Sequence, residues 1–437
     1  MSGSSSPAAG SSSLATSSKA LFGPIPLPSD TYARCLEVFG VVPKPEQIEV
    51  ADILARREDC ILRAGYAWGE IDVYFIPLIL WPDRITIILS PLKTLAEEQQ
   101  QKLDRLGISS IAIRWETDIT KKLLNELGNG KYRAVFLCPK ILITGDRLRQ
   151  LWFMEPWRSS LLAVVVDEAH CISTWGKDFR KDYEYIGTLR ARVRRDVPFL
   201  AVSATLPPRI LDDVKAGLYC EPDVRVISVG NDRPNIKYAV TRPQRPVNSY
   251  RDLSFLLDFK KSIVYFPNNS VTESAARYLR GLLDNSADLS KIAVYHSVKS
   301  DELKRVVLEK FRDNKVLLLL TTEALEMGCD INDVVRVVQY GVPSSISTLI
   351  QRFGRAARNP TIEGHGLLLA PQTVSSKIDN DLSRYIQAEG CRRRVLNEIF
   401  GNEHRDNDRC CDKCNPEKQA NAEAYNGTSA KATSKQA

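Results

Sequence analysis

Between Leu21 and Ile227, short apolar runs alternate with amphipathic stretches. The runs "RITIILSPL", "YRAVFLCP", "LLAVVVDEAH" and "PFLAVSATLPP" are each typical of a buried strand that leads into polar residues. This alternation predicts a parallel sheet covered by helices. Functional groups gather at the carboxyl ends of the strands in such sheets. Here those ends carry Ser90, Asp167, Glu168, Ser203 and Thr205.

A second block of the same kind follows an interruption. The segment "SVGNDRPNIKYAVTRPQRPVNS" contains three Pro and many polar residues, which predicts an interdomain linker. The later strands are expected in "SIVYFPNN", "KIAVYHS", "VLLLLTTEA" and "VVRVVQYGVP". From Asp381 to Gly401 the pattern becomes helical and leads into a cluster of cysteines. The predicted fold class is therefore α/β, with two tandem parallel-sheet lobes and a small helical subdomain.

The predicted domain organisation follows these changes of pattern, since the length suits about two or three domains. Residues 1–20 form a Ser/Ala-rich tail and residues 417–437 a polar tail, and both are expected to be disordered. The first lobe is predicted at 21–228, the second lobe at 229–390, and a zinc-binding subdomain at 391–416.

Composition narrows the class of protein. With 43% hydrophobic and 26% charged residues, the 437-residue chain is typical of a soluble globular protein, and no apolar run is long enough to predict a transmembrane helix. The start of the chain lacks the apolar core of a secretory signal. Ten Cys without such a signal indicate thiols or metal ligands in a reducing compartment. The net charge of +7 permits a nucleic-acid partner without requiring one.

Four motifs lie at predicted strand ends or helix starts: "VVVDEAHCISTWGKDFRKDY", "VSATLPP", "LTTEALEMGCDI" and "QRFGRAARNP". Each is weak alone. In this order, and with "DRPNI" and "CRRRVLNEIFG…CCDKC", they resemble the RecQ family of DNA helicases from about Phe39 to Cys414. DEAD-box RNA helicases share the two-lobed motor, but as a family they lack that aromatic loop and the terminal cysteines.

The resemblance implies two RecA-like lobes with ATP and Mg²⁺ in the cleft between them. Asp167 would hold the Mg²⁺ and Glu168 would orient the attacking water, while Arg355 and Arg358 would stabilise the γ-phosphate charge from the second lobe. The alternative for the two arginines is a solvated basic helix face. The nucleotide-binding positions implied are Gln47 (against adenine), Ala64, Gly65, Gly69, Glu70, Ile71 and Gln351, and the positions that couple the lobes are Ser203, Thr205 and Asp330.

The aromatic loop after the acidic pair is the expected contact with single-stranded DNA. Trp175 and Phe179 can stack on bases, at about 1–3 kcal/mol per base, and Arg180 can pair with phosphate. The alternative is that both aromatic side chains belong to the core, but their polar neighbours favour an exposed loop. The family usually has Gln and His at the positions of Thr174 and Lys177. Their replacement is expected to affect the coupling of DNA binding to ATP hydrolysis more than DNA binding itself.

The terminal cysteines resemble the zinc subdomain of the family. Cys391, Cys411 and Cys414 fit three of its four thiolate positions. The fourth ligand is either Cys410 or His404, because adjacent residues rarely both reach one tetrahedral ion. The alternative interpretation is that these cysteines are buried free thiols.

The stretch "AGYAWGEI" has the outline of a phosphate-binding loop, which needs a small residue, four variable positions, Gly, Lys, and Ser or Thr. From Ala64, Gly69 is in place, but Glu70 stands where the Lys belongs and Ile71 where the hydroxyl belongs. At ~4 Å and an effective dielectric near 20, reversing that charge amounts to about 8 kcal/mol. Arg63 is the only nearby cation, and it lies on the wrong side of the loop.

These residues predict a RecQ-type helicase scaffold with impaired ATP hydrolysis. Two readings stay open: an ATP-driven 3′–5′ DNA helicase, and a non-catalytic relative that binds DNA or a protein partner. A decayed gene copy is a third. The expected partner is single-stranded or forked DNA, without membrane association, for a monomer that the resemblance places in the nucleus.

Overall fold

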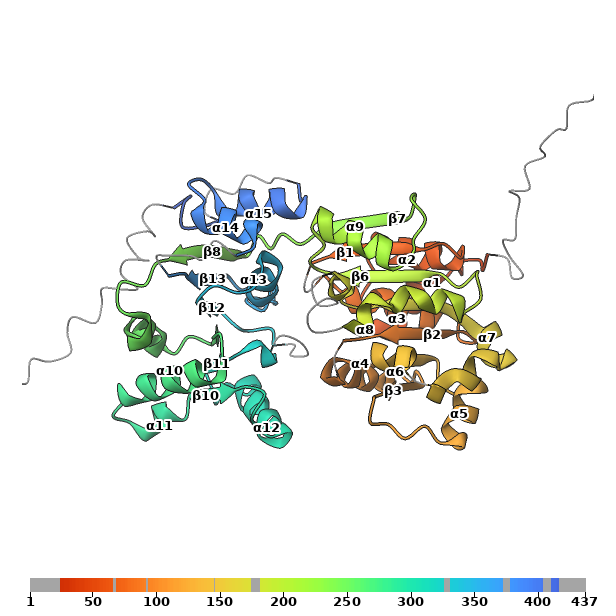
Figure 1. The fold of residues 1–437 in the computed structure, drawn as a ribbon, viewed down its shortest axis with the longest axis horizontal. Helices are drawn as coiled ribbons and strands as arrows, with labels where there is room; N and C mark the ends of the chain where they lie inside the picture. Colours follow the sequence, from red (N-terminus) through yellow and green to blue (C-terminus); the bar gives the residue numbers. More distant parts are fainter. Residues whose placement is uncertain are drawn as a thin grey trace, which may run out of the picture.

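The computed structural model describes residues 24–65, 68–91, 93–144, 146–173, 181–325, 331–371, 378–403 and 410–415. Two lobes lie side by side and are joined by a single extended segment (Figure 1). Each lobe is built around a parallel sheet with helices on its two faces, so the predicted α/β class with two parallel-sheet lobes is confirmed.

In the described residues, the first lobe contains a seven-stranded sheet in the order β3-β4-β2-β5-β6-β1-β7. All six residues of the central strand β5 are buried. Val164 and Val166 face one hydrophobic cluster, while Leu162 and Val165 face the other, which explains the continuous apolar run in the sequence. The strands are β1 Cys60–Ala64, β2 Ile85–Leu89, β3 Ser110–Ile113, β4 Ala134–Leu137, β5 Leu161–Val166, β6 Phe199–Ser203 and β7 Arg225–Gly230.

Helices cover both faces of this sheet. One face is packed by α1 Thr31–Phe39, α2 Pro45–Ala55, α3 Glu70–Leu80 and α4 Lys93–Arg105. The other is packed by α5 Lys121–Gly128, α6 Pro139–Thr144, α7 Glu155–Ser160, α8 Lys181–Glu184 and α9 Pro208–Gly217. Among the described residues, no helix has the length and hydropathy needed to span a membrane.

The second lobe has a six-stranded sheet, counted over its described residues, in the order β10-β11-β9-β12-β13-β8. Its strands are β8 Ile236–Thr241, β9 Ser262–Tyr265, β10 Ile292–Tyr295, β11 Leu318–Thr321, β12 Arg336–Tyr340 and β13 Gly364–Leu369. Its helices are α10 Asn269–Gly281, α11 Ser286–Leu289, α12 Asp301–Arg312, α13 Ile346–Phe353, α14 Asn380–Gln387 and α15 Arg392–Phe400. The helical pattern expected from Asp381 to Gly401 is thus two helices.

One sequence-based assignment was wrong. The segment 228–249 was predicted to be a linker, yet it contains β8, which pairs in parallel with β13 from Ile236↔Gly364 to Thr241↔Leu369. Only alternate residues of β8, Ile236 and Tyr238, are fully buried, because β8 lies at the edge of the sheet. The prolines that suggested a linker flank the strand and leave its ladder intact. The segment that joins the sheets is therefore short, residues 231–235.

The cysteine-rich end of the chain packs against β8. Tyr238 N–H donates to the Cys410 carbonyl at 3.2 Å, and Asp412 N–H donates to the Tyr238 carbonyl at 3.0 Å. The chain after α15 therefore lies along the outer edge of the second sheet. In Figure 1, α14 and α15 lie above β8, with α15 directed toward the first lobe.

Candidate nucleotide site and cysteine cluster

The polar residues singled out in the first lobe gather at one edge of its sheet. Strands β2, β5, β6 and β1 are consecutive and parallel, so their carboxyl ends coincide. These ends carry Ser90 after β2, Asp167 after β5, Ser203 at the end of β6, and Ala64 and Gly65 at the end of β1. The expected clustering of these residues at the carboxyl edge is therefore present.

Asp167 is nearly enclosed, with 6% of its surface exposed. Burial, and next the negative charge of Glu168, raise the pKa of Asp167 to about 7, against a weaker opposing effect of the Gln99 amide. The Gln99 amide on α4 lies 3.5 Å from Asp167 Oδ2 and donates to the Tyr74 hydroxyl at 2.8 Å. A divalent cation would relieve the cost of ionising this carboxylate. Asp167 is thus suited to hold Mg²⁺, and Gln99 and Tyr74 are neighbours that sequence reasoning missed.

Glu168 adopts a left-handed backbone conformation, φ 50°, that is uncommon for a residue other than Gly. Its carboxylate lies 3.2 Å from Nδ1 of the buried His170. The same Nδ1 lies 2.9 Å from Ser203 Oγ, and Thr205 N–H donates to Ser203 Oγ at 3.2 Å. The acidic pair is therefore connected through His170 to the residues predicted to couple the lobes.

Gln351 brings the second lobe into this network. It lies on α13, and its Nε2 is 2.9 Å from His170 Nε2 and 3.4 Å from Thr205 Oγ1. His170 was not singled out from the sequence, although it belongs to the DEAH motif. It is the side chain that contacts Glu168, Ser203 and Gln351 together. Such a network can transmit the state of the acidic pair to the second lobe.

The two candidate arginine fingers follow α13 directly. Arg355 is only 7% exposed and Arg358 is half-buried, so the alternative of a solvated basic helix face does not describe them. Ala357 between them has φ 47°, and its N–H donates to the Val334 carbonyl at 2.7 Å. The neighbouring Arg352 is a structural residue instead, because it donates to Gln339 Oε1 at 2.6 Å in the core of the lobe.

The described residues at the two ends of the degenerate loop form hydrogen bonds with one another and with neighbouring segments. Gly65 N–H donates to the Gly230 carbonyl at 2.9 Å, and Trp68 N–H donates to the Gly65 carbonyl at 3.1 Å. Gly69, with φ 98°, precedes α3. The buried Gln47 amide donates to the Gly69 carbonyl at 3.0 Å, so the candidate adenine-reading residue contacts the loop. Glu70 begins α3, but the side chains of Glu70 and Ile71 lie outside the described residues.

Two cations near the loop differ in their placement. Arg63 points away from the loop, to the second lobe, and donates to the carbonyls of Phe400 and Gly401, the latter at 3.0 Å. Lys44 was overlooked, because it lies well before the loop in sequence. Its ammonium donates to the Trp68 carbonyl and lies 4.7 Å from the centre of the Trp68 ring. Lys44 thus contacts the loop without occupying the position of the missing Lys.

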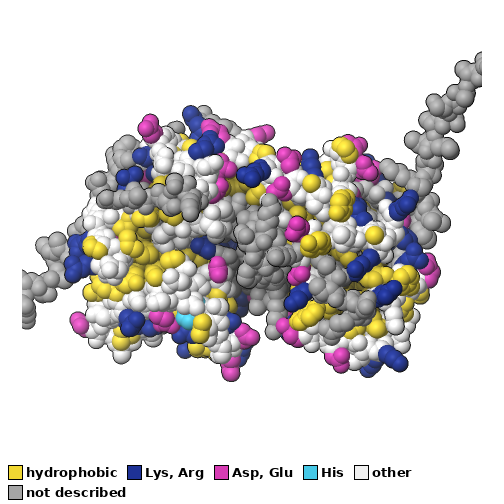
Figure 2. Space-filling view, in the orientation of Figure 1, with side chains coloured by type: hydrophobic (Ala, Val, Ile, Leu, Met, Phe, Trp, Pro, Cys, Tyr) yellow, Lys and Arg dark blue, Asp and Glu magenta, His cyan; other side chains and the backbone are white. Residues whose placement is uncertain are grey.

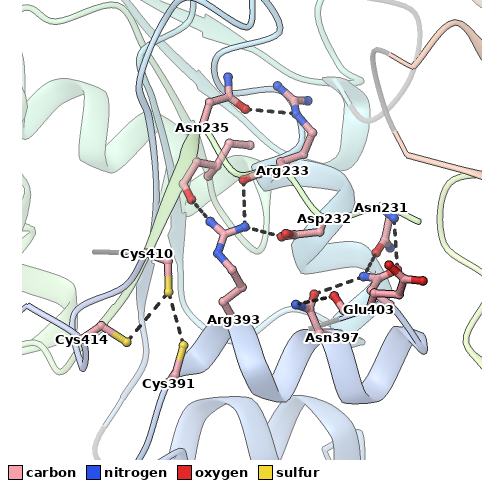
Figure 3. A network of polar contacts seen from close by, with 12 residues as sticks. Asn231, Asp232, Arg233, Asn235, Cys391, Arg393, Asn397, Glu403, Cys410 and Cys414 are labelled. Carbon is pink, nitrogen blue, oxygen red and sulfur yellow. Dashed lines mark hydrogen bonds and ion pairs between the residues drawn. The ribbon is translucent and has the colours of Figure 1, made fainter. Parts of the chain in front are cut away.

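The cysteine cluster brings together four thiols, those of Cys391, Cys410, Cys411 and Cys414, within 4.8 Å of one another. The Sγ–Sγ distances are 3.3 Å for Cys391–Cys410, 3.9 Å for Cys410–Cys414 and 3.5 Å for Cys411–Cys414. A tetrahedral zinc ion with Zn–S bonds of about 2.3 Å requires sulfurs roughly 3.8 Å apart. The four residues therefore fit a zinc ion, and adjacent Cys410 and Cys411 both reach the site. In Figure 3 the cluster lies at the start of the helix that carries Arg393.

Several candidate residues lie outside the described residues. These are the DNA-binding candidates Trp175, Phe179 and Arg180, the coupling candidate Asp330, and the alternative zinc ligand His404. Their roles remain sequence-based predictions. On the face shown in Figure 2, basic and acidic side chains are interspersed over both lobes, in keeping with the modest net charge of +7.

Two family models match the two lobes. Residues 44–214 match the model described as "DEAD/DEAH box helicase", and residues 250–360 match "Helicase conserved C-terminal domain". Together with the paired sheets and the interlobe network, these matches define a two-lobed helicase of superfamily 2. Within that class, the chain belongs to the RecQ family.

The chain is similar to three curated helicases. It is 30% identical to "RecQ-like DNA helicase blm-1" of Caenorhabditis elegans, across 82% of this chain and 38% of that protein. It is 26% identical to the mouse "Bifunctional 3'-5' exonuclease/ATP-dependent helicase WRN", across 90% of this chain and 30% of that protein. It is 25% identical to "ATP-dependent DNA helicase RecQ" of Haemophilus influenzae, across 84% of this chain and 60% of that protein. The chain thus spans less than two thirds of each relative.

Solved structures show the same fold. The DUF1998 helicase MrfA bound to DNA and AMPPNP superposes with a TM-score of 0.66 at 18% identity, over 87% of this chain and 55% of that one. The Mycobacterium smegmatis helicase Lhr bound to ssDNA and AMP-PNP gives a TM-score of 0.59 at 18% identity, over 79% and 48%.

Proposed function

We propose that this chain is a RecQ-type helicase scaffold that binds DNA and is impaired in ATP hydrolysis. The observation that carries the proposal is the contrast between two parts of one site. Asp167, Glu168 and His170 lie in a connected network that reaches Gln351 of the other lobe. The loop that must hold the triphosphate has Glu70 and Ile71 at the positions of its cation and its hydroxyl.

The acidic pair supports descent from an active motor. A buried carboxylate with a raised pKa can hold a divalent cation, and a neighbouring carboxylate can orient water for attack on a phosphoryl group. The C. elegans and H. influenzae relatives are named as DNA helicases, and that substrate is a property of those two proteins. We carry it to this chain because the chain is a family member and has an aromatic, basic stretch at Trp175 to Arg180.

The loop argues against efficient turnover, because in a working loop a Lys contacts the β- and γ-phosphates and a Ser or Thr hydroxyl holds the Mg²⁺. Arg63 and Lys44, the cations of the described residues discussed above, contact carbonyl groups instead. Asp167 alone is a weak anchor for an ion that requires near-octahedral oxygen coordination. A deficit of about 4 kcal/mol in transition-state stabilisation lowers a rate about a thousandfold.

The experiment is a DNA-stimulated phosphate-release assay on the unmodified chain and on Glu70→Lys with Ile71→Ser. We expect negligible release from the unmodified chain and measurable, DNA-stimulated release after repair. Glu168→Gln in the repaired background is the control and should abolish the gain. Ordinary helicase turnover by the unmodified chain, lost in Glu168→Gln, would refute the proposed impairment.

The second candidate is a non-catalytic relative that binds DNA or a protein partner, and Glu70 and Ile71 are the observation that favours it. The same assay separates the two. If the repaired chain also fails to turn over ATP while single-stranded DNA still binds, the non-catalytic reading is preferred.

We also propose that the cysteine cluster binds one zinc ion per chain. The four thiols fit a tetrahedral ion, and burial raises the pKa of Cys410 to about 11, so a bound cation would be needed to stabilise its thiolate. Zinc would supply folding energy to the subdomain and take no part in phosphoryl transfer. Elemental analysis of the purified chain tests this proposal.

A further inference from the structure

The short segment that joins the two sheets, residues 231–235, contacts α15 at Asp232 and Arg233. Arg393, in the first turn of α15, is almost completely buried. Its guanidinium donates to the Asp232 carboxylate, to the Arg233 carbonyl at 3.0 Å and to the Ile236 carbonyl at 2.6 Å (Figure 3). One side chain thus fixes both the joining segment and the first residue of β8.

The start of α15 is in turn fixed by the cysteine cluster. Cys391 immediately precedes the helix. Arg392 forms a two-pronged ion pair with Asp412, at 2.7 Å and 3.0 Å, and Asp412 lies between the cluster members Cys411 and Cys414. A metal bound by these thiols would therefore fix two segments that contact the first turn of α15. They are Cys391, which precedes the helix, and Cys411–Cys414, which contains Asp412.

The other end of α15 contacts the first lobe. Arg63 of β1 donates to the Phe400 carbonyl and, at 3.0 Å, to the Gly401 carbonyl, which are the unsatisfied acceptors at the end of the helix. A cation at a helix carboxyl terminus is also favoured by the helix dipole. Arg63 Nε also donates a hydrogen bond to Ser228 Oγ at 2.8 Å. It directly precedes Ala64 and Gly65, where the degenerate loop begins.

A second connection runs beside the first. Asn402, just after α15, donates to Asn231 Oδ1 at 2.7 Å, and Asn231 Nδ2 donates to the Ala204 carbonyl at 3.1 Å. Ala204 lies between Ser203 and Thr205, the candidate coupling residues. The carboxyl end of α15 therefore contacts both the strand that leads into the loop and, through Asn231, the turn that couples the lobes.

We propose that α15 is a strut through which the cysteine cluster sets the relative position of the two lobes, with Arg63 as the positioning residue on the first lobe. The role of metal in this device rests on the proposed zinc binding; the role of Arg63 does not. Metal loss releases the start of α15, and the carbonyls that Arg63 contacts then lose their fixed position. The consequence is a wider range of interlobe distances at the nucleotide site.

The test measures the interlobe distance in the full chain. Probes are introduced as non-natural amino acids at the exposed Lys122 on α5 and Glu302 on α12, so that the native cysteines stay unlabelled. We expect a narrow distance distribution for the zinc-loaded chain and a broader one for Arg63→Ala. A zinc chelator should broaden the distribution of the unmodified chain and add little in Arg63→Ala.

Two further variants keep the test decisive. Arg63→Lys retains a cation for the helix end and should restore most of the narrow distribution. Arg384→Ala, which removes an exposed arginine that pairs with Glu398 on α15 at 3.1 Å, should leave the distribution unchanged. A folded Arg63→Ala variant with full zinc content and an unbroadened distribution overturns the proposal. If elemental analysis finds no zinc, the metal proposal fails, and the Arg63 variants still decide whether α15 is a strut.

Discussion

The Gln351 side-chain amide meets the His170 ring across the two lobes, with 2.9 Å between their Nε2 atoms. In the neutral ring, a Gln351 N–H that donates to Nε2 leaves the ring proton on Nδ1, toward Glu168 and Ser203. Burial alone lowers the pKa of His170, but the neighbouring Cys171 sulfur and the Glu168 carboxylate outweigh it and raise the pKa above its usual value. Protonation of Nε2 would require Gln351 to present its oxygen instead.

Removing this contact should weaken the contact between the lobes. We expect Gln351→Ala to lower the free energy of unfolding by about 0.5–1.5 kcal/mol, the usual net contribution of a hydrogen bond. Chemical denaturation measures the change. Gln387→Ala is the matched control, because that exposed glutamine bonds only to Ser383 on its own helix, at 3.1 Å, among the described contacts. Equal destabilisation by both variants would contradict the assigned role of Gln351.

Asp167 should make the stability of the metal-free protein depend on pH. Its pKa is raised to about 7 in the folded state by burial and by Glu168, whereas an unfolded Asp titrates near 4. The folded state therefore binds more protons between these values, and stability falls as pH rises through this window. Asp167→Asn should remove that part of the fall, by about 1 kcal/mol or more. Urea denaturation of both proteins at pH 5 and pH 8, with a chelator present, checks this.

The identity of the fourth zinc ligand can be decided by two substitutions. Since Cys410 Sγ lies 3.3 Å from Cys391 Sγ and 3.9 Å from Cys414 Sγ, Cys410→Ala should release zinc readily, and His404→Ala should retain it. Release is followed with a colorimetric chelator. The opposite ranking would assign the fourth position to His404.

Single-stranded DNA should bind without ATP turnover, because the aromatic stretch does not depend on the phosphate loop. Trp175→Ala should cost roughly 1–3 kcal/mol if its ring stacks on a base. Affinity should fall steeply with salt, as expected for phosphate contacts. Fluorescence anisotropy with a labelled oligonucleotide measures both effects. Phe153→Ala, which removes an exposed aromatic ring elsewhere in the first lobe, is the control and should bind normally.

The sequence predicted the interior of the fold better than its edges. Strands buried on two faces, such as β5 and β11, read as unbroken apolar runs and were located correctly. The edge strand β8 was assigned to a linker because it buries few residues between prolines. Asp167 and Glu168 were found through their motif. The contact of Arg63 with Phe400 was out of reach, because nothing local in either segment indicates a partner 337 positions away.

The cysteine segment also has a protective role for the sheet it flanks. β8 is the outermost strand of the second sheet, and the exchange of backbone hydrogen bonds between Tyr238 and the chain from Cys410 to Asp412 covers part of its free edge. An uncovered strand edge is a template for pairing with another chain. Oxidative damage to these thiols would therefore threaten more than the local fold, since it would expose a sheet edge to intermolecular aggregation.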